Sequence, residues 1–160
     1  MKISFSSRYQ YEKAFMPMKI VPNKTSGTGH YNIFDEKDNF VGEFTFYKYD
    51  NIGFVEDLKI PNKLRRSIVS ANALFSVKNF ILNQAKEKNL ELIRFSASTE
   101  NPFNVVRLYK KLFPNVQNVQ VSDSIEFAYP VSQSGERRAK KLLSEFKEMV
   151  DNFPKIRAEF

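Results

Sequence analysis

The spacing of hydrophobic and polar residues changes within the stretch from Asn51 to Ala85. Between Ile52 and Ile60 apolar side chains recur at alternate positions except at Glu56, which predicts a half-buried β-strand. Pro61 and Asn62 should end this strand, because proline cannot donate a backbone hydrogen bond. Strict alternation then assigns the side chains to two opposite faces: Phe54, Leu58 and Ile60 on one, and Val55, Asp57 and Lys59 on the other.

After the strand, the apolar spacing becomes three and four residues, which is typical of an amphipathic helix. The predicted helix is roughly five turns long. Such a stripe is stable only when it is buried, so we expect this helix to pack on a sheet. The stripe consists of Ile68, Ala71, Leu74, Val77, Ile81 and Ala85.

The short turn between strand and helix is basic, with three cations between Lys63 and Ser67. A helix N-terminus normally favours anions, because its free N–H groups and its dipole are both positive there. A basic first turn is therefore consistent with an anion bound to those N–H groups. The alternative is that Arg65 and Arg66 are ordinary solvated loop residues.

The same spacing rules predict the remaining elements. Two hairpins, one strand and two helices follow from alternation, turn residues and apolar stripes. A strand, a helix and a second strand in this order imply a parallel pair with a right-handed connection. The predicted elements are strands 30–34 and 40–49, strand 90–97, helix 103–112, strands 116–121 and 125–129, and a helix that Ser134 caps and that ends before Pro154.

The composition fits one folded domain. The chain has 160 residues with 42% hydrophobic content, and two halves would each be too small for a stable core. The absence of cysteine excludes disulfides, thiolate nucleophiles and cysteine-rich zinc sites. The single histidine, His30, lies beside glycines, so we expect a loop or strand-edge residue rather than a ligand.

The net charge of +7, with an isoelectric point near 9.5, favours a partner that carries several negative charges. Nucleic acid, an acidic protein and a nucleotide cofactor all satisfy this condition. The sequence has neither a long apolar run nor the apolar core of a signal peptide near its start. We therefore expect a soluble protein without a membrane partner, and the cytoplasm is the default location.

The order of the predicted elements resembles that of the GNAT family of N-acetyltransferases over residues 30–130. The resemblance rests most on IPNKLRRSIVSANALF and on ENPFNVVRLYKKLFP. It implies a divergent member with a single α/β domain spanning 1–160. That fold is a mixed, mostly antiparallel sheet with a central parallel pair flanked by helices. The amphipathic helix at 134–153 would be an addition to it.

The resemblance also implies acetyl-CoA as the cofactor, with its pyrophosphate bound where the basic turn enters the helix. Ile68 and Ser70 stand where the family has Gly and then Gly or Ala, which changes how closely the backbone can approach a phosphate. The implied cofactor-binding residues are Leu58, Ile60, Arg65, Arg66, Ser67, Ile68, Val69, Ser70 and Asn101.

For catalysis, the resemblance implies direct transfer of an acetyl group to an amine of a protein, a peptide or a small molecule. Tyr109 matches the tyrosine that commonly donates a proton to the departing thiolate. Glu56 and Asp57 are the candidate bases, with Glu43 on the neighbouring strand. Alternation places Glu56 and Asp57 on opposite faces, so at most one of them is well placed.

A second interpretation keeps the fold without catalysis. In this case basic side chains, among them those at 137–141, would contact nucleic acid or an acidic protein. The C-terminal helix would cover the core, shape the acceptor site, or form a contact with a second copy of the chain.

Overall fold

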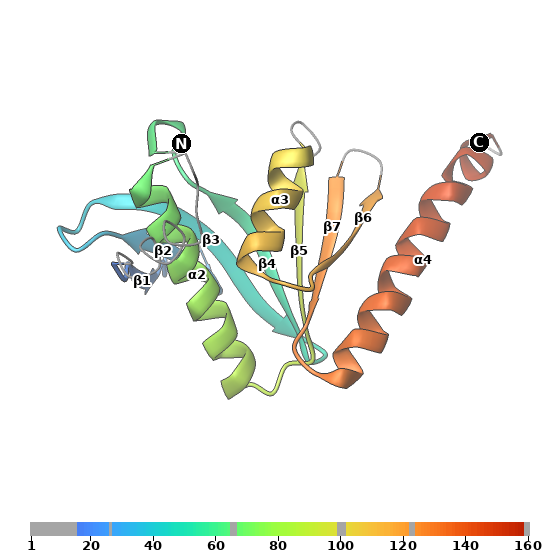
Figure 1. The fold of residues 1–160 in the computed structure, drawn as a ribbon, viewed down its shortest axis with the longest axis horizontal. Helices are drawn as coiled ribbons and strands as arrows, with labels where there is room; N and C mark the ends of the chain where they lie inside the picture. The colour runs from blue at the N-terminus through green and yellow to red at the C-terminus, as the bar shows by residue number, and fades with distance from the viewer. Residues whose placement is uncertain (1–15, 26, 65–66, 99–101, 122–123, 159–160) are drawn as a thin grey trace, which may run out of the picture.

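The computed structural model describes residues 16–25, 27–64, 67–98, 102–121 and 124–158. Within this part the chain forms one seven-stranded sheet in the order β1-β2-β3-β4-β5-β7-β6, with three α-helices (Figure 1). The strands are β1 (Lys19–Pro22), β2 (His30–Phe34), β3 (Phe40–Tyr49), β4 (Ile52–Lys59), β5 (Leu92–Ser98), β6 (Gln117–Val121) and β7 (Ser124–Pro130). The helices are η1 (Asn62–Leu64), α2 (Ile68–Glu87), α3 (Pro102–Leu112) and α4 (Gln133–Ala158).

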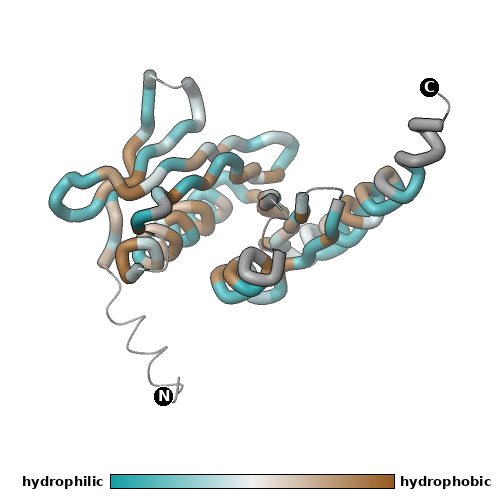
Figure 2. The backbone as a smooth tube through the Cα atoms, turned by 90° about the horizontal axis from the view of Figure 1, so that it is seen from above, coloured by the Kyte–Doolittle hydropathy of each residue, from teal (hydrophilic) through white to brown (hydrophobic). Residues whose placement is uncertain are grey.

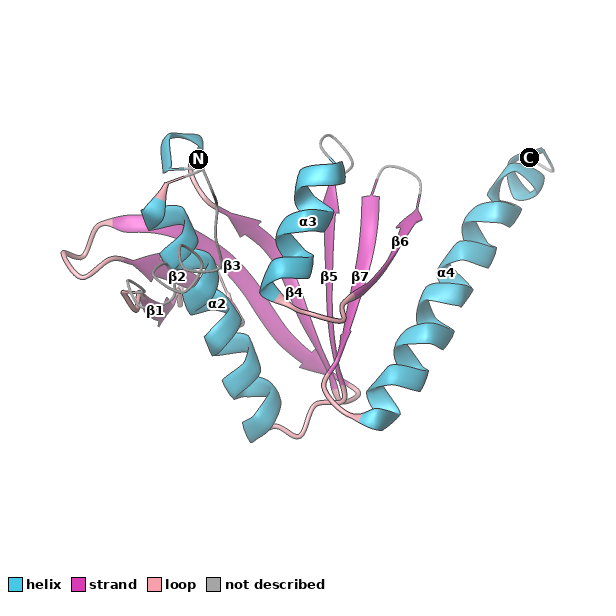
Figure 3. Ribbon diagram, viewed as in Figure 1, coloured by secondary structure: helices cyan, strands magenta, loops and turns pink. Residues whose placement is uncertain are grey.

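The predicted fold class is confirmed. All neighbouring strands pair antiparallel except β4 and β5, which α2 connects as a parallel pair near the middle of the sheet. The helices α2 and α3 pack on one face, and α4 packs on the other (Figure 3). No helix in the described ranges has an apolar stretch long enough to cross a lipid bilayer.

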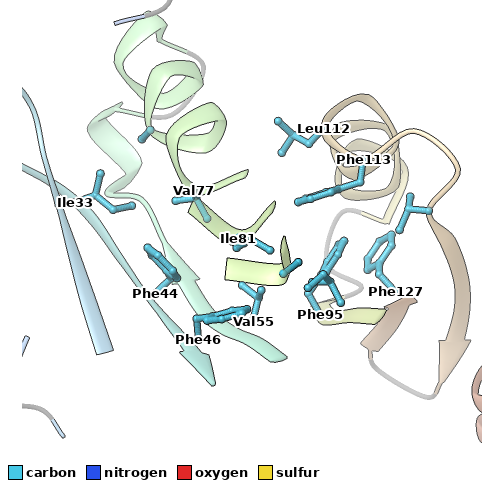
Figure 4. Packing of buried hydrophobic residues seen from close by; sticks show 14 of the residues in the cluster. Ile33, Phe44, Phe46, Val55, Val77, Ile81, Phe95, Leu112, Phe113 and Phe127 are labelled. Atoms are coloured by element: carbon cyan, nitrogen blue, oxygen red, sulfur yellow. The ribbon is translucent and has the colours of Figure 1, made fainter. Parts of the chain in front are cut away.

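The larger of two hydrophobic clusters lies between the sheet and the pair α2 and α3. Figure 4 shows Val77 and Ile81 of α2 directed toward the sheet, and the rings of Phe95, Phe113 and Phe127 gathered near α3. Phe95 stacks on Phe127 with 5.1 Å between ring centroids. The smaller cluster lies under α4, where Ile52, Leu92, Ala128, Ala139 and Leu143 pack together.

The long helix α2 forms where the apolar spacing predicts it, but its first turns are buried differently. Ile68 is 52% exposed, whereas the polar residues Asn72 and Ser76 are buried. The backbone N–H groups of Met16 and Met18 donate to the side chains of Asn72 and Ser76, at 3.4 and 2.9 Å. The chain before β1 therefore covers this part of α2, and polar residues are needed there to accept its N–H groups.

The predicted alternation along β4 is wrong beyond Val55, because the strand contains a β-bulge. Thr45 of β3 lies opposite Glu56, but Glu43 lies opposite Lys59, so β4 has one residue more than its partner between these points. Asp57 takes up this residue in a left-handed conformation with φ 52°. As a result Leu58 packs with Val55 against the larger cluster, while Phe54 packs against the smaller one.

The C-terminal helix is longer than predicted and has a different cap. The Ser132 side chain accepts the N–H of Gly135 at 3.1 Å, whereas the Ser134 hydroxyl donates to Glu91 at 3.2 Å. The helix also continues past Pro154 to Ala158. The proline removes one backbone hydrogen bond but does not end the helix. Toward its C-terminal end α4 extends away from the other elements in both views (Figures 1 and 2).

Candidate functional site

The parallel strands β4 and β5 pair over only part of their length. Their described pairing ends at Val55 and Phe95, although β4 continues to Lys59 and β5 to Ser98. Figure 1 shows the two strands separating toward the N-terminal end of α2. Beyond this point the facing backbone groups no longer pair with each other and can bind a ligand. The bulge at Asp57 lies in the same stretch of β4.

Tyr109 of α3 lies where the two strands separate. Its ring contacts those of Phe95 and Phe127, with centroids 4.6 and 4.9 Å apart. Burial raises the pKa of Tyr109 to about 12, because the charged phenolate is poorly solvated there. A phenol in this environment keeps its proton at neutral pH, and its hydroxyl can act as a hydrogen-bond donor.

A small apolar pocket adjoins Tyr109 between α2, α3 and the two strands. Its walls include Val55, Leu58, Leu74 and Phe95, and its volume is about 10 Å³, the room of roughly one water molecule. Leu58 and Ile60 both pack against the larger cluster. Their side chains therefore form part of the core, and a ligand at this edge would contact mainly their backbone.

The two candidate bases differ in their surroundings. The Glu56 carboxylate is exposed and accepts a hydrogen bond of 2.7 Å from the Tyr47 hydroxyl. Tyr47 stacks on Phe54, which packs on the α4 side of the sheet, so Glu56 lies on the face opposite Tyr109. Asp57 is exposed at the bulge. Groups from the two faces can approach each other only where β4 and β5 are separated.

The N-terminal end of α2 is capped by Ser67, whose hydroxyl accepts the N–H of Ser70 at 3.2 Å. Among the described residues, the N–H groups of Ile68 and Val69 have no acceptor. Ser70 is buried, and Ile68 is largely in solvent. Arg65, Arg66 and Asn101, which the sequence also assigns to cofactor binding, lie outside the described residues.

Sequence reasoning missed two side chains beside Glu56. The Tyr47 hydroxyl donates a hydrogen bond to the carboxylate, and the Arg94 guanidinium of β5 lies over the rings of Phe54 and Phe146. Alternation in β3 and β5 places these residues on one face, but only the strand register shows that they are neighbours.

The single histidine of the chain, His30, forms a side-chain hydrogen bond with Thr45, with 2.9 Å between Nδ1 and Oγ1. No cluster of potential metal ligands occurs among the described residues.

No protein-family model and no curated protein matches the amino-acid sequence. Solved structures do match the fold. A GNAT-family acetyltransferase from Bacillus anthracis aligns with a TM-score of 0.52 and 15% identity, over 64% of this chain and 66% of that one. An acetyltransferase from Bacillus subtilis in complex with CoA aligns with a TM-score of 0.51 and 12% identity, over 64% and 76% of the two chains.

Spermidine N-acetyltransferase from Vibrio cholerae, in complex with CoA and spermine, aligns with a TM-score of 0.50 and 15% identity over 63% of this chain and 64% of that one. The chain thus spans slightly less than two thirds of this protein and of the B. anthracis protein. At such identities the likeness concerns the fold. The chain has the fold of GNAT acetyltransferases, in a divergent form.

Proposed function

We propose that this protein is an N-acetyltransferase that transfers an acetyl group from acetyl-CoA to an amine of a protein, a peptide or a small molecule. The observation that carries the proposal is the separation of β4 and β5 beside the partly buried Tyr109, whose poorly solvated phenol has a raised pKa. The fold shared with acetyltransferases, two of them solved with CoA, supports the same reaction class.

The chain offers two kinds of group that suit acetyl-CoA, which would supply the activated acetyl group. Backbone groups of β4 beyond Val55 face the gap and suit an extended amide-containing arm. The N–H groups of Ile68 and Val69 at the start of α2 suit a pyrophosphate. Because Ile68 is 52% exposed, most of its side chain projects into solvent rather than into the helix packing. Arg65 and Arg66 would add positive charge.

Two proton transfers are then assigned to side chains of this chain. The Glu56 carboxylate accepts the proton that the acceptor amine loses as its nitrogen bonds to the acetyl carbon. The Tyr109 hydroxyl donates a proton to the sulfur as the carbon–sulfur bond breaks. Glu56 is preferred over Asp57 because the Tyr47 hydroxyl holds its carboxylate at 2.7 Å.

Binding of acetyl-CoA tests this proposal directly. A ligand at one hundred times its dissociation constant adds about 2.7 kcal/mol to the free energy of unfolding, which should raise the melting temperature by roughly 5–10 °C. ATP at the same concentration is the control, since it carries phosphates without a thioester arm. An unchanged melting temperature at millimolar acetyl-CoA, or an equal rise with ATP, would contradict the proposal and favour a binding module that recognises polyanions.

The substitution Tyr109→Phe separates catalysis from packing. It removes only the hydroxyl, so acetyl-CoA should still bind while the transfer rate falls by roughly 10²–10⁴-fold. Transfer can be followed with a panel of amines that contains polyamines and lysine peptides. A variant with the wild-type rate would assign Tyr109 to the hydrophobic core alone.

A further inference from the structure

A continuous line of side-chain contacts joins α4 to the candidate base on the opposite side of the sheet from Tyr109. The Phe146 ring of α4 lies over the Arg94 guanidinium, 4.6 Å from it. The same guanidinium lies 5.5 Å from the Phe54 ring of β4. Arg94 therefore contacts two rings, one from the sheet and one from the helix.

The line continues from Phe54 to Glu56 through β3. Tyr47 stacks on Phe54 with ring centroids 5.0 Å apart and planes 9° apart. Its hydroxyl then donates to the Glu56 carboxylate at 2.7 Å. The hydrogen bond to Glu56 is the main reason that the pKa of Tyr47 is raised. Each side chain in this line of contacts thus restricts the conformations that the next side chain can adopt.

Arg94 is the member that fixes this geometry. Its side chain is 16% exposed, and burial lowers its pKa, although the nearby Glu126 carboxylate at 3.5 Å opposes this effect. A partly desolvated guanidinium is stable only with its partners in place. Without the Phe146 ring, water would reach Arg94, and the guanidinium could leave Phe54 for solvent.

We propose that α4 positions the catalytic base: Phe146 holds Arg94 against Phe54, and this contact keeps Tyr47 in place to orient the Glu56 carboxylate. This inference rests on the proposed function. Phe146, Arg94, Phe54 and Tyr47 are positioning residues in this arrangement, and Glu56 alone meets the acceptor. The C-terminal helix thereby becomes part of the acceptor side of the site.

The first test uses the protein without acetyl-CoA. Tyrosine labelled with ¹³C at Cζ gives a separate NMR titration for Tyr47, which faces Glu56 and Arg94, with Glu126 beyond Arg94. Phe146→Leu keeps apolar bulk but removes the ring, so the pKa of Tyr47 should fall toward its usual value. Phe146→Tyr should keep the wild-type titration, and so should Met149→Leu on an exposed part of α4.

The second test measures transfer. Phe146→Leu should lower kcat/KM for the acceptor about tenfold, because Glu56 is less well oriented. The affinity for acetyl-CoA should not change, since its proposed binding groups lie at the start of α2 and at the edge of β4. Phe146→Tyr should restore kcat/KM, and Met149→Leu should match the wild type.

The two proposals fail in different ways. If the wild type binds acetyl-CoA and transfers acetyl groups, while Phe146→Leu changes neither the Tyr47 titration nor kcat/KM, the positioning role of α4 is wrong and the proposed function stands. If the wild type does not bind acetyl-CoA, the proposed function fails, and the inference fails with it.

Discussion

The burial of one phenol has consequences for both stability and chemistry. Tyr109 packs against Phe95 and Phe127, and its pKa of about 12 lies above the usual value of 10. A raised folded-state pKa means that the unfolded chain loses its proton at lower pH than the folded chain. The stabilisation is therefore complete below pH 10 and is lost as the pH rises through the folded-state value.

This loss of stability at high pH gives a prediction for alkaline solution. Between pH 10 and 12, the wild-type free energy of unfolding should fall by up to about 2–3 kcal/mol more than that of Tyr109→Phe. Urea unfolding at pH 8, 10 and 11 measures this difference. Tyr49→Phe is the matched control, because Tyr49 is 72% exposed and should leave the wild-type dependence intact. Parallel curves for Tyr109→Phe and the wild type would show that the phenol is well solvated.

Sequence reasoning reached individual residues only where the backbone was regular. Tyr109 is found from its place in a helical motif, and Glu56 from its place on a strand. The faces of Leu58 and Asp57 could not be predicted, because the bulge depends on a left-handed conformation at an aspartate. The roles proposed for Tyr109 and Glu56 remain predictions.

At the scale of elements, the first two turns of α4 are attached to the loops at one end of the sheet. Arg138 donates to the Asp50 carboxylate at 2.7 Å and to Glu91 at 2.9 Å, and so bridges two loops at one end of the sheet. Gly135 lies against the backbone of Glu91, where a Cβ atom would overlap the carbonyl oxygen. Close approach of these two backbones therefore requires glycine.

Gly135→Ala should consequently destabilise the protein by about 1–3 kcal/mol, because the first turn of α4 must move away from Glu91. The sign is informative, since the same change inside an unconstrained helix stabilises it by up to about 1 kcal/mol. Chemical unfolding measures the effect. Lys140→Ala on the exposed side of α4 should stay within about 0.5 kcal/mol of the wild type. A neutral or stabilising Gly135→Ala would mean that the loop at Glu91 yields easily.

The spacing of apolar residues predicted which elements exist, but it predicted less well which residues near the ends of those elements are buried. It located α2 correctly, because the stripe at Val77, Ile81 and Ala85 is buried. It did not predict the burial of Asn72 and Ser76, which depends on the chain before β1 lying alongside. Long-range contacts of this kind leave no periodic signal in the sequence.

For the whole molecule, a single sheet carries both hydrophobic clusters. Neighbouring residues of β5 pack on opposite faces of the sheet, since Ile93 belongs to the larger cluster and Leu92 to the smaller one. Because both clusters pack against β5, we expect them to lose their packing together. The single-domain organisation stays a prediction, and cooperative unfolding is its test.

Unfolding should accordingly be one cooperative transition. The far-UV circular dichroism of the helices and the near-UV signal of the tyrosines should give the same midpoint in urea. Phe46→Leu in the larger cluster and Leu143→Ala in the smaller one should each lower both midpoints together. Two separate transitions, one of them affected by Leu143→Ala alone, would show that the region under α4 folds independently.

The fold itself followed from the order of elements and one rule of connection. A strand, a long helix and a second strand predict the parallel pair of β4 and β5, and the hairpins supply the antiparallel strands on each side. The acetyltransferase-like fold is confirmed by solved structures that align with TM-scores of 0.50–0.52 although only 12–15% of the residues are identical.

The bulge at Asp57 also determines where insertions and deletions can be accepted. Removing one residue there would restore strict alternation and the matched register with β3, and Leu58 would stay on the face of Val55, in the larger cluster. Removing one residue between Ile52 and Val55 would instead exchange the faces of the residues on its two sides. Residues 36–39 of the turn between β2 and β3 are exposed, and the turn can change in length there without moving a buried side chain. Homologous chains should therefore vary in length at that turn, and within β4 they should lose a residue only at the bulge.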